Sequence, residues 1–424
     1  MPKHIVMLSS LDTKAPEAAE LKHCIEKQGA CPIVLDIGYG RPPQMDADIT
    51  ADDVAVAAGT TIEQIRNMQD TGSASSRMTQ GAIILVHELF RDGQCDGIIG
   101  FGGASNTTVA TSVMKSLPVG VPKLMISSAA ALPAYAASYF GSRDITMMHA
   151  VVDISGLNEL TRPILCQGAA AVCAMAESGG RVVGPFQRGS MIAVTSFRFA
   201  EQCAQHVMHG LEQLGYGAIP FHAQGVGENA MENLIGEGLF KAVVDIVPAG
   251  LSEQMLGGNR AARADRLEAA GRMGIPQVIA PGGFDMISCG PIARRDHRDL
   301  LWEERGIADR KYTVPDRFRV EARTTAGEVA EIGRAVGEKL NRAIGPVSVL
   351  VPTLGWSSLS VEGADLYDPA ADSEFVPALK QMLKLGIPVR EIRAELNSET
   401  FARELVMEVH AMIRSVAGDK EARN

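Results

Sequence analysis

The residues best suited to chemistry lie in one short glycine-rich stretch, 97–108. An apolar run ends there at two adjacent glycines, Gly102 and Gly103, and hydroxyl and amide side chains follow. This order is typical of a buried parallel strand, a tight turn and the first turn of a helix. Adjacent glycines let a ligand come close to the backbone, and the N–H groups at a helix N-terminus favour phosphate or carboxylate. The stretch predicts an anion site or, equally, a plain strand-to-helix turn.

Three other polar segments should end at the same edge of the sheet. In an open parallel sheet, ligands lie beyond the carboxyl ends of the strands, near the point where the strand order reverses. Backbone N–H groups and hydroxyls would hold phosphates there, and Lys14 would neutralise charge, unless it is simply an exposed lysine. Asp12 and Thr13 could instead cap a helix. The predicted binding residues are Ser9, Asp12, Thr13, Lys14, Gly38, Gly102, Gly103, Ser105, Asn106, Thr107, Ser127 and Ser128.

Three carboxylates are the candidates for acid–base or metal-binding roles: Asp153, Glu232 and Asp285. Asp153 ends an apolar run and could bind a ribose hydroxyl, Mg²⁺ or a substrate proton, or cap the next helix. Glu228 and Glu232 are four residues apart, so both would lie on one helix face. A buried pair could serve acid–base chemistry, although a solvated helix start is the favoured interpretation for Glu228. Asp285 follows a second glycine pair, 282–283.

No metal site is predicted. His206 and His209 lie three residues apart, with Cys203 one turn earlier, but no further cluster supports a metal-binding face. The pattern G-x-S-x-G is absent, and no Ser/His/Asp set is marked by spacing. Residues 325–328 fit a capping box, so Thr325 is predicted to be structural. Arg323 is left as a possible contact for an anion.

Length and composition limit the class of protein. A chain of 424 residues is too long for one core, so two domains are expected. The net charge of -10 argues against sequence-independent nucleic-acid binding, which depends on lysine and arginine. No stretch approaches the roughly 18 apolar residues of a membrane span, and the first residues do not have the form of a signal peptide. Seven cysteines without C-x-x-C argue against a disulfide framework. We therefore expect a cytoplasmic protein without nucleic-acid or membrane partners.

Strand-like runs alternate with helical stretches in both halves of the chain, which favours parallel sheets. The pattern restarts near Met191: Ile5 aligns with Ile192, and Gly29 aligns with Gly215, at an offset of about 186 residues. The charge-dense run 294–319 is predicted to be a surface insertion. We predict an α/β fold with two Rossmann-like, doubly wound parallel-sheet domains related by internal duplication. They would span residues 1–185 and 186–424, joined near 179–189, with a ligand cleft between them.

A string of motifs adds a family resemblance that covers nearly the whole chain. The sequence resembles the ATP-binding domain family named for a plant tobamovirus-resistance protein, whose bacterial members are mostly uncharacterised. The resemblance implies two Rossmann-like domains, an ATP-type nucleotide in the first, self-association into homodimers and a role for Glu232. The motifs are residues 117–123, 152–158, 230–232, 271–285, 323–325 and 368–372.

The chain departs from the family pattern mainly in its second half. Residues 225–229 replace the usual Gly-Gly-Arg run, 314–317 replace a His-Asn-Pro segment, and the turn 129–131 lacks its usual glycine. We expect a protein that binds ATP, with Mg²⁺ as the usual companion of a triphosphate. It would act as a transferase or ligase on a small carboxylate or carbonyl metabolite. The alternatives are a non-catalytic nucleotide-dependent interaction module and a metabolite enzyme that uses no nucleotide.

Overall fold

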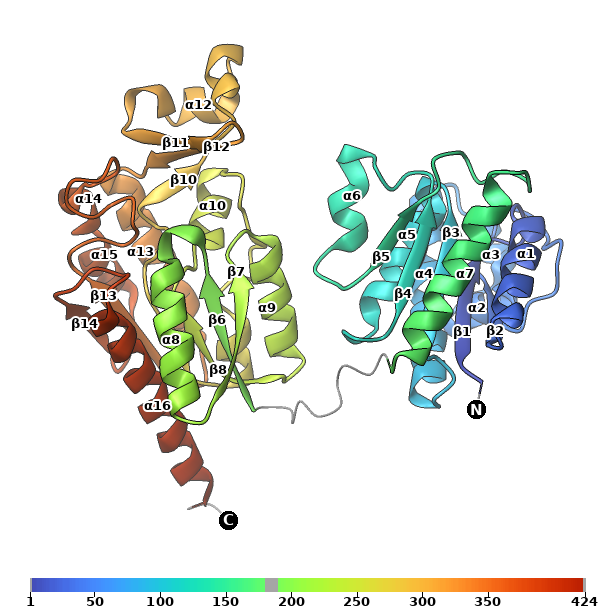
Figure 1. The fold of residues 1–424 in the computed structure, drawn as a ribbon, viewed down its shortest axis with the longest axis horizontal. Helices are drawn as coiled ribbons and strands as arrows, with labels where there is room; N and C mark the ends of the chain where they lie inside the picture. The colour runs from blue at the N-terminus through green and yellow to red at the C-terminus, as the bar shows by residue number, and fades with distance from the viewer. Residues whose placement is uncertain (1, 180–189, 422–424) are drawn as a thin grey trace. The chain divides into compact units, whose positions relative to one another are not determined.

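The computed structural model describes residues 2–179 and 190–421, and side chains as far as 418. The chain divides into two compact units, Met1–Pro185 and Phe186–Asn424. Each unit is built on its own parallel sheet with helices packed against it (Figure 1). The predicted α/β class with two Rossmann-like domains is therefore confirmed. The predicted linker, 180–189, lies outside the described residues.

The sheet of the N-terminal domain has the strand order β2-β1-β3-β4-β5, and every neighbouring pair is parallel. The chain moves from β1 outward to β2 and then returns to the other side of β1. The strand order therefore reverses between β1 and β3. The strands are β1 (His4–Ser9), β2 (Cys31–Asp36), β3 (Gly97–Gly102), β4 (Lys123–Ser127) and β5 (Thr146–His149).

Helices cover both faces of this sheet because successive strand residues point to opposite sides. Val6 and Ile98 pack with helices α4 and α5, whereas Ile5 and Ile99 pack with helices α1 and α7. The sheet is thus buried on both faces, as its nearly continuous apolar strands predict. The helices are α1 (Ala15–Lys27), α2 (Ala51–Ala57), α3 (Ile62–Arg66), α4 (Thr71–Arg91), α5 (Ala104–Ser116), α6 (Pro133–Phe140) and α7 (Thr161–Glu177).

The C-terminal domain repeats the same plan with one more strand. Its parallel sheet has the order β14-β13-β9-β8-β6-β7, so the order reverses between β6 and β8. The strands are β6 (Met191–Ser196), β7 (Gly217–His222), β8 (Phe240–Asp245), β9 (Gln277–Ile279), β13 (Val347–Pro352) and β14 (Val389–Ile392). A small antiparallel sheet lies beside it, formed by β10 (Met286–Ser288), β12 (Arg319–Arg323) and β11 (Tyr312–Asp316).

The run predicted as a surface insertion is partly integrated into this domain. It contains the whole of β11, which pairs with β12 (Figure 1). It also carries Trp302 and Ile307, both of which are buried in a hydrophobic cluster with Val320. The apolar residues between the charges anchor the segment, which a reading by charge alone does not detect.

Helices also flank both faces of the larger sheet. Thr325 caps α13 as predicted, since its hydroxyl accepts the Glu328 N–H and its own N–H donates to the Glu328 carboxylate. The last helix is longer than predicted and runs to Glu421. The helices are α8 (Glu201–Gln213), α9 (Val226–Gly236), α10 (Gly250–Leu256), α11 (Ala269–Met273), α12 (Leu300–Glu304), α13 (Ala326–Leu340), α14 (Pro369–Asp372), α15 (Phe375–Met382) and α16 (Glu399–Glu421), with 3₁₀ turns at Arg198–Ala200, Ile292–His297 and Ile307–Asp309.

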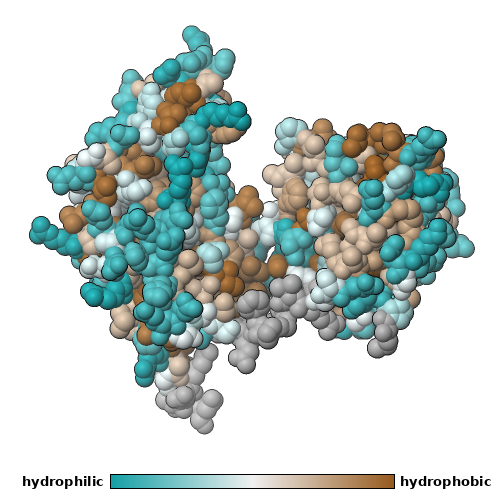
Figure 2. Space-filling view, in the orientation of Figure 1, coloured by the Kyte–Doolittle hydropathy of each residue, from teal (hydrophilic) through white to brown (hydrophobic). Residues whose placement is uncertain are grey.

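Within residues 2–179 and 190–421, no helix combines the length and the apolar character that crossing a membrane requires. In the space-filling view, hydrophilic residues cover much of the visible face of each unit, with smaller hydrophobic areas between them (Figure 2).

Candidate functional site

A pocket of about 260 Å³ lies at the carboxyl ends of β1 and β3. This is where the strand order of the N-terminal domain reverses, and open parallel sheets bind their ligands at such points. The walls come from the loops after β1 and β2, from α4 and from the start of α5. The lining residues are Ser10, Asp12, Thr13, Ile37, Gly38, Tyr39, Gly40, Ser75, Ser105, Asn106 and Val109.

The two glycines before α5 have different roles. Gly102 has a φ of +143°, and a Cβ there would lie 2.8 Å from the Asn106 side chain, so the turn itself requires glycine. Gly103 has an ordinary φ of -85°, and the nearest atom to an added Cβ would be the Ser128 hydroxyl at 3.8 Å. Gly103 is the N-cap residue and provides no capping side chain. The first turn of α5 therefore begins without the side-chain acceptor that usually satisfies its N–H groups.

Polar side chains stand beside this helix start. Ser105 is exposed at the second position of α5, and Asn106 follows it. The Ser10 hydroxyl donates to the Asn106 side-chain oxygen at 2.9 Å, which fixes the orientation of the amide. The pocket therefore combines an uncapped helix N-terminus with hydroxyl and amide groups, the arrangement that binds anions in α/β proteins.

Asp12 organises the opposite wall. Its carboxylate accepts the N–H groups of Gly40 at 2.9 Å and Arg41 at 3.2 Å. It does not cap α1, whose N-cap residue is Lys14, so the capping alternative for Asp12 is wrong. A Cβ on Gly38 would lie 2.6 Å from an Asp12 oxygen. Glycine at that position therefore allows the loop after β2 to approach the carboxylate.

Asp36, at the end of β2, holds the two loops of this wall together through hydrogen bonds. It accepts the N–H groups of Leu11 at 3.0 Å and Gly38 at 2.8 Å. Burial raises the pKa of the Asp36 carboxyl, and these two hydrogen bonds partly oppose that shift. The loops after β1 and β2 are thus tied together by backbone N–H groups and two carboxylates.

Five of the twelve predicted binding residues belong neither to the pocket lining nor to the Gly102–Gly103 turn beside it. The Lys14 ammonium donates to the Ile154 carbonyl. The buried hydroxyls of Thr107 and Ser127 lie 2.7 Å apart and join α5 to β4, and the Ser128 N–H donates to the Gly102 carbonyl. Ser9 is fully buried, and its hydroxyl has no partner among the described residues. These contacts show roles within the fold for four of the five residues.

The other seven predicted residues meet at one place. Asp12, Thr13, Gly38, Ser105 and Asn106 line the pocket, and Gly102 and Gly103 form the turn beside it. Sequence reasoning missed several lining residues. Ser10 and Tyr39 adjoin predicted positions and could have been included, whereas Ser75 on α4 comes from a distant segment and carries no local pattern.

The predicted catalytic carboxylates lie in three different environments. Asp153 is exposed in the loop after β5. The capping alternative for it is wrong, because the Asn158 side chain accepts the N–H groups of Leu160 at 2.9 Å and Thr161 at 3.0 Å at the start of α7.

Glu232 belongs to a buried cluster around Arg266. Its oxygens accept the Arg266 guanidinium at 3.0 Å and the N–H groups of Leu267 and Ala269 at 2.8 Å. Glu228 and Asp245 contact the same guanidinium at 2.9 Å and 2.8 Å. All of these contacts are within the domain, so they indicate that Glu232 has a structural role.

The expectation that Glu228 lies in a solvated helix start is wrong. The side chain is fully buried, and it accepts the N–H groups of Gly225 and Gly250 at 2.9 Å. Burial raises the pKa of Glu228, and the charge of Arg266 opposes the shift. Arg266, which pairs with Glu228, lies 38 residues further along the chain, so no local pattern revealed that Glu228 is buried.

Asp285 is fully buried in the C-terminal domain. It accepts the Ser357 hydroxyl at 2.6 Å, and its other oxygen has no partner among the described residues. Arg323 donates to the Asp285 carbonyl at 2.6 Å and also to the Asp372 carboxylate. The predicted anion contact of Arg323 is thus taken up by a carboxylate of the same chain.

Asp372 lines a pocket of about 350 Å³ near the carboxyl ends of β13 and β14. Burial raises the pKa of Asp372 to about 7, against the lowering effect of Arg323. The same pocket includes Lys380 and the apolar side chains of Trp356 and Val376. It therefore offers a carboxyl group that titrates near neutrality, which is a common property of functional sites.

Comparison with known proteins places the sequence in a family. Residues 3–180 match the N-terminal domain of the Uncharacterised protein family (UPF0261), and residues 189–413 match its C-terminal domain. The chain belongs to UPF0261. A UPF0261 protein of Clostridium tetani is 35% identical over 405 residues, covering 95% of this chain and 97% of that protein.

The resemblance to the plant resistance protein is confirmed at the level of homology. The ToMV resistance protein Tm-1(GCR237) of Solanum lycopersicum is 31% identical over 332 residues, which cover 73% of this chain and 40% of the plant protein. Among solved structures, UDP-N-acetylglucosamine 2-epimerase from Rickettsia bellii matches with a TM-score of 0.20 and 9% identity, covering 66% of this chain and 78% of the other. A score this low carries no functional argument.

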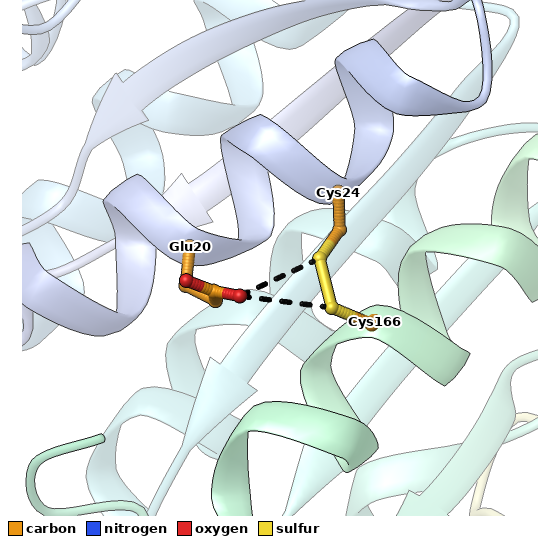
Figure 3. A group of neighbouring side chains, drawn as sticks. All are labelled: Glu20, Cys24 and Cys166. Atoms are coloured by element: carbon orange, nitrogen blue, oxygen red, sulfur yellow. Dashed lines mark hydrogen bonds between the residues drawn. A yellow bond between two sulfur atoms is a disulfide. The ribbon is translucent and has the colours of Figure 1, made fainter. Parts of the chain in front are cut away.

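One feature of this UPF0261 chain was not expected. Cys24 on α1 and Cys166 on α7 form a disulfide across 142 residues, with Glu20 beside it (Figure 3). The sequence argument against a disulfide framework did not identify this single bond, because nothing in the spacing pairs the two cysteines. Among the described residues, these three side chains are also the group placed to hold a metal ion. Cys203 is fully buried, and His206 and His209 line a separate groove between α8 and α16.

Proposed function

We propose that the N-terminal domain binds a phosphorylated ligand, of which ATP is the leading candidate, in the pocket at the carboxyl ends of β1 and β3. The observation that carries this proposal is the uncapped start of α5 at the point of strand reversal. Such a helix end presents N–H donors and partial positive charge to a phosphate. The exposed hydroxyl of Ser105 adds a further donor.

The charges in the pocket favour one orientation of the ligand. Among the described residues that line it there is no lysine or arginine, and Asp12 supplies a negative charge on one wall. A phosphate is therefore better placed at α5, whereas a hydroxyl donor such as a ribose suits Asp12. Tyr39 adds an aromatic side chain to the lining, against which a base could pack. A triphosphate would be accompanied by Mg²⁺, which retains most of its waters and needs few protein ligands.

The finer proposal is an enzyme that acts on a small carboxylate or carbonyl metabolite. The pocket with Asp372 supports it, because a carboxyl group with a pKa of about 7 can donate or accept a proton at neutral pH. Lys380, which pairs with Glu391 of the same pocket at 3.8 Å, would exchange that partner for the negative charge of such a substrate. The corresponding reaction class is transfer of a phosphoryl group from ATP to the carboxylate of the substrate with release of ADP, or transfer of a nucleotidyl group with release of pyrophosphate.

A pair of charge variants tests the nucleotide site. Ser105→Asp places a carboxylate in the first turn of α5, where it favours the helix but opposes a phosphate. Thr108→Asp is the matched control, with the same charge on the same helix outside the pocket lining. ATP at 100 times its Kd should stabilise the wild type by about 2.7 kcal/mol. We expect at least a 10-fold weaker Kd, roughly 1.4 kcal/mol, in Ser105→Asp only. An equal ATP response in both variants would remove this pocket from the proposal.

A ligand panel distinguishes the remaining functions. Thermal stabilisation by ATP, ADP and AMP should exceed that by inorganic phosphate. Turnover of ATP with one of a panel of small organic acids would support the enzyme. Lys380→Met should then weaken binding of that acid while leaving ATP-induced stabilisation unchanged. ATP binding without turnover of any acid would favour a nucleotide-dependent interaction module. Stabilisation by a sugar phosphate but not by ATP would indicate an enzyme without a nucleotide.

A further inference from the structure

Three potential metal ligands converge between two helices of the N-terminal domain. Glu20 and Cys24 are four residues apart on α1, so both lie on the same helix face. That face packs against α7, which carries Cys166 (Figure 3). The Cα atoms of the two cysteines are 5.3 Å apart. The helices therefore hold two sulfur atoms and a carboxylate at one place.

The Glu20 carboxylate is oriented by a separate contact. Its Oε2 atom pairs with the Arg162 guanidinium, which leaves Oε1 facing the sulfur atoms. Oε1 lies 4.0 Å from the Cys24 Sγ and 3.8 Å from the Cys166 Sγ, as the dashed lines in Figure 3 show. Two ligands of one tetrahedral zinc ion lie about 3.6 Å apart, given metal bonds of about 2.1 to 2.3 Å. The carboxylate is thus already near the distance from each sulfur that a shared metal requires. Metal ligands are commonly held by such outer contacts.

We propose that reduction of the Cys24–Cys166 disulfide creates a binding site for a thiophilic divalent cation, Zn²⁺, held by Cys24, Cys166 and Glu20. Two thiolates and one carboxylate suit zinc, which accepts sulfur and oxygen ligands in tetrahedral geometry. Water would complete the fourth position. Cys166 is half-buried, so the cluster has a path to solvent.

The charges and the redox chemistry are consistent with this site. A dithiol reductant supplies two electrons and two protons, breaks the S–S bond and leaves two thiols. Zinc binding then releases both protons, because thiolates are the ligands. Two thiolates, the Glu20 carboxylate, the Arg162 guanidinium and Zn²⁺ leave the cluster without net charge. The oxidised protein has no free thiolate at this place, so the same two cysteines form either the disulfide or the metal site.

Cobalt substitution tests the proposal on the full chain. The protein is reduced, freed of reductant under anaerobic conditions and titrated with Co²⁺, and Zn²⁺ is then used to displace the cobalt. We expect one equivalent of Co²⁺ with thiolate-to-cobalt charge-transfer absorption and the visible bands of tetrahedral cobalt. The oxidised protein should show neither. Zinc should raise the melting temperature of the reduced protein only.

Variants separate this site from other cysteines. Cys24→Ser and Cys166→Ser should each lose the charge-transfer band of a two-thiolate site. Cys31→Ser is the matched control, because Cys31 is half-buried on β2 and is outside the cluster. Glu20→Gln should keep thiolate absorption but weaken Zn²⁺ binding at least 10-fold, because losing a direct ligand should cost no less than losing an outer contact, which costs about 10- to 100-fold. Circular dichroism confirms folding of each variant. Absence of the band in the reduced wild type, or its persistence in both Cys24→Ser and Cys166→Ser, would overturn the proposal.

Discussion

Replacing each glycine of the turn before α5 by alanine should have opposite effects on stability. At Gly102, an L-residue at φ +143° costs about 1 to 2 kcal/mol. Its Cβ would also lie 2.8 Å from the Asn106 side chain, and relieving such a contact costs about 1 to 3 kcal/mol. We therefore expect Gly102→Ala to lower the free energy of unfolding of the N-terminal domain by about 3 kcal/mol, combining these two costs.

Gly103→Ala is the matched control one residue away. Gly103 has a φ of -85°, and the nearest atom to its added Cβ is 3.8 Å away. A compatible Gly→Ala change stabilises a protein by about 0.4 to 1 kcal/mol, because it restricts the unfolded chain. We expect no loss of stability.

Urea unfolding followed by two probes measures this difference. Both tryptophans of the chain, Trp302 and Trp356, are in the C-terminal domain, so their fluorescence reports that domain alone. Far-ultraviolet circular dichroism reports both domains. Gly102→Ala should shift the dichroism transition of the N-terminal domain and leave the fluorescence transition in place. Equal stability of Gly102→Ala and Gly103→Ala would refute the assignment of the strained turn to Gly102.

Two further predictions concern the C-terminal domain. Arg266→Met leaves Glu228, Glu232 and Asp245 buried without their cation and should destabilise the domain by about 3 to 5 kcal/mol, measured by tryptophan fluorescence in urea. Burial raises the pKa of Glu321 to about 7, above its unfolded value, so the folded domain binds more protons than the unfolded chain. The stability of the domain should therefore fall by up to roughly 3 kcal/mol as pH rises from about 4.5 to 7. Glu321→Gln should remove this part of the pH dependence.

Each of these two variants has a control on the same domain. Arg263→Met removes an exposed guanidinium near Arg266 and should cost less than about 1 kcal/mol. Glu304→Gln removes an exposed carboxylate and should leave the pH slope unchanged. A similar cost for Arg263→Met and Arg266→Met, or an unchanged slope in Glu321→Gln, would contradict the roles assigned to the buried charges.

Local patterns in the sequence determined the elements and their type. The glycine pair after an apolar run predicted the end of β3 and the start of α5, and Thr325 predicted the cap of α13. Alternating strands and helices predicted two parallel sheets. These features depend on residues within one or two turns of each other, so periodicity and capping are sufficient to reveal them. Five predicted residues, Asp12 among them, also line one pocket, because parallel strands end at a common edge.

The tertiary structure decided which side chains are used within the fold. Lys14 contacts Ile154, and Glu232 is bound to Arg266, although both were predicted at functional sites. Cys24 meets Cys166 across 142 residues. Partners so distant in the chain are brought together by helix packing on a shared sheet, and buried charges must find a counter-charge wherever packing places one. No local spacing encodes these pairings, so only the folded chain reveals them.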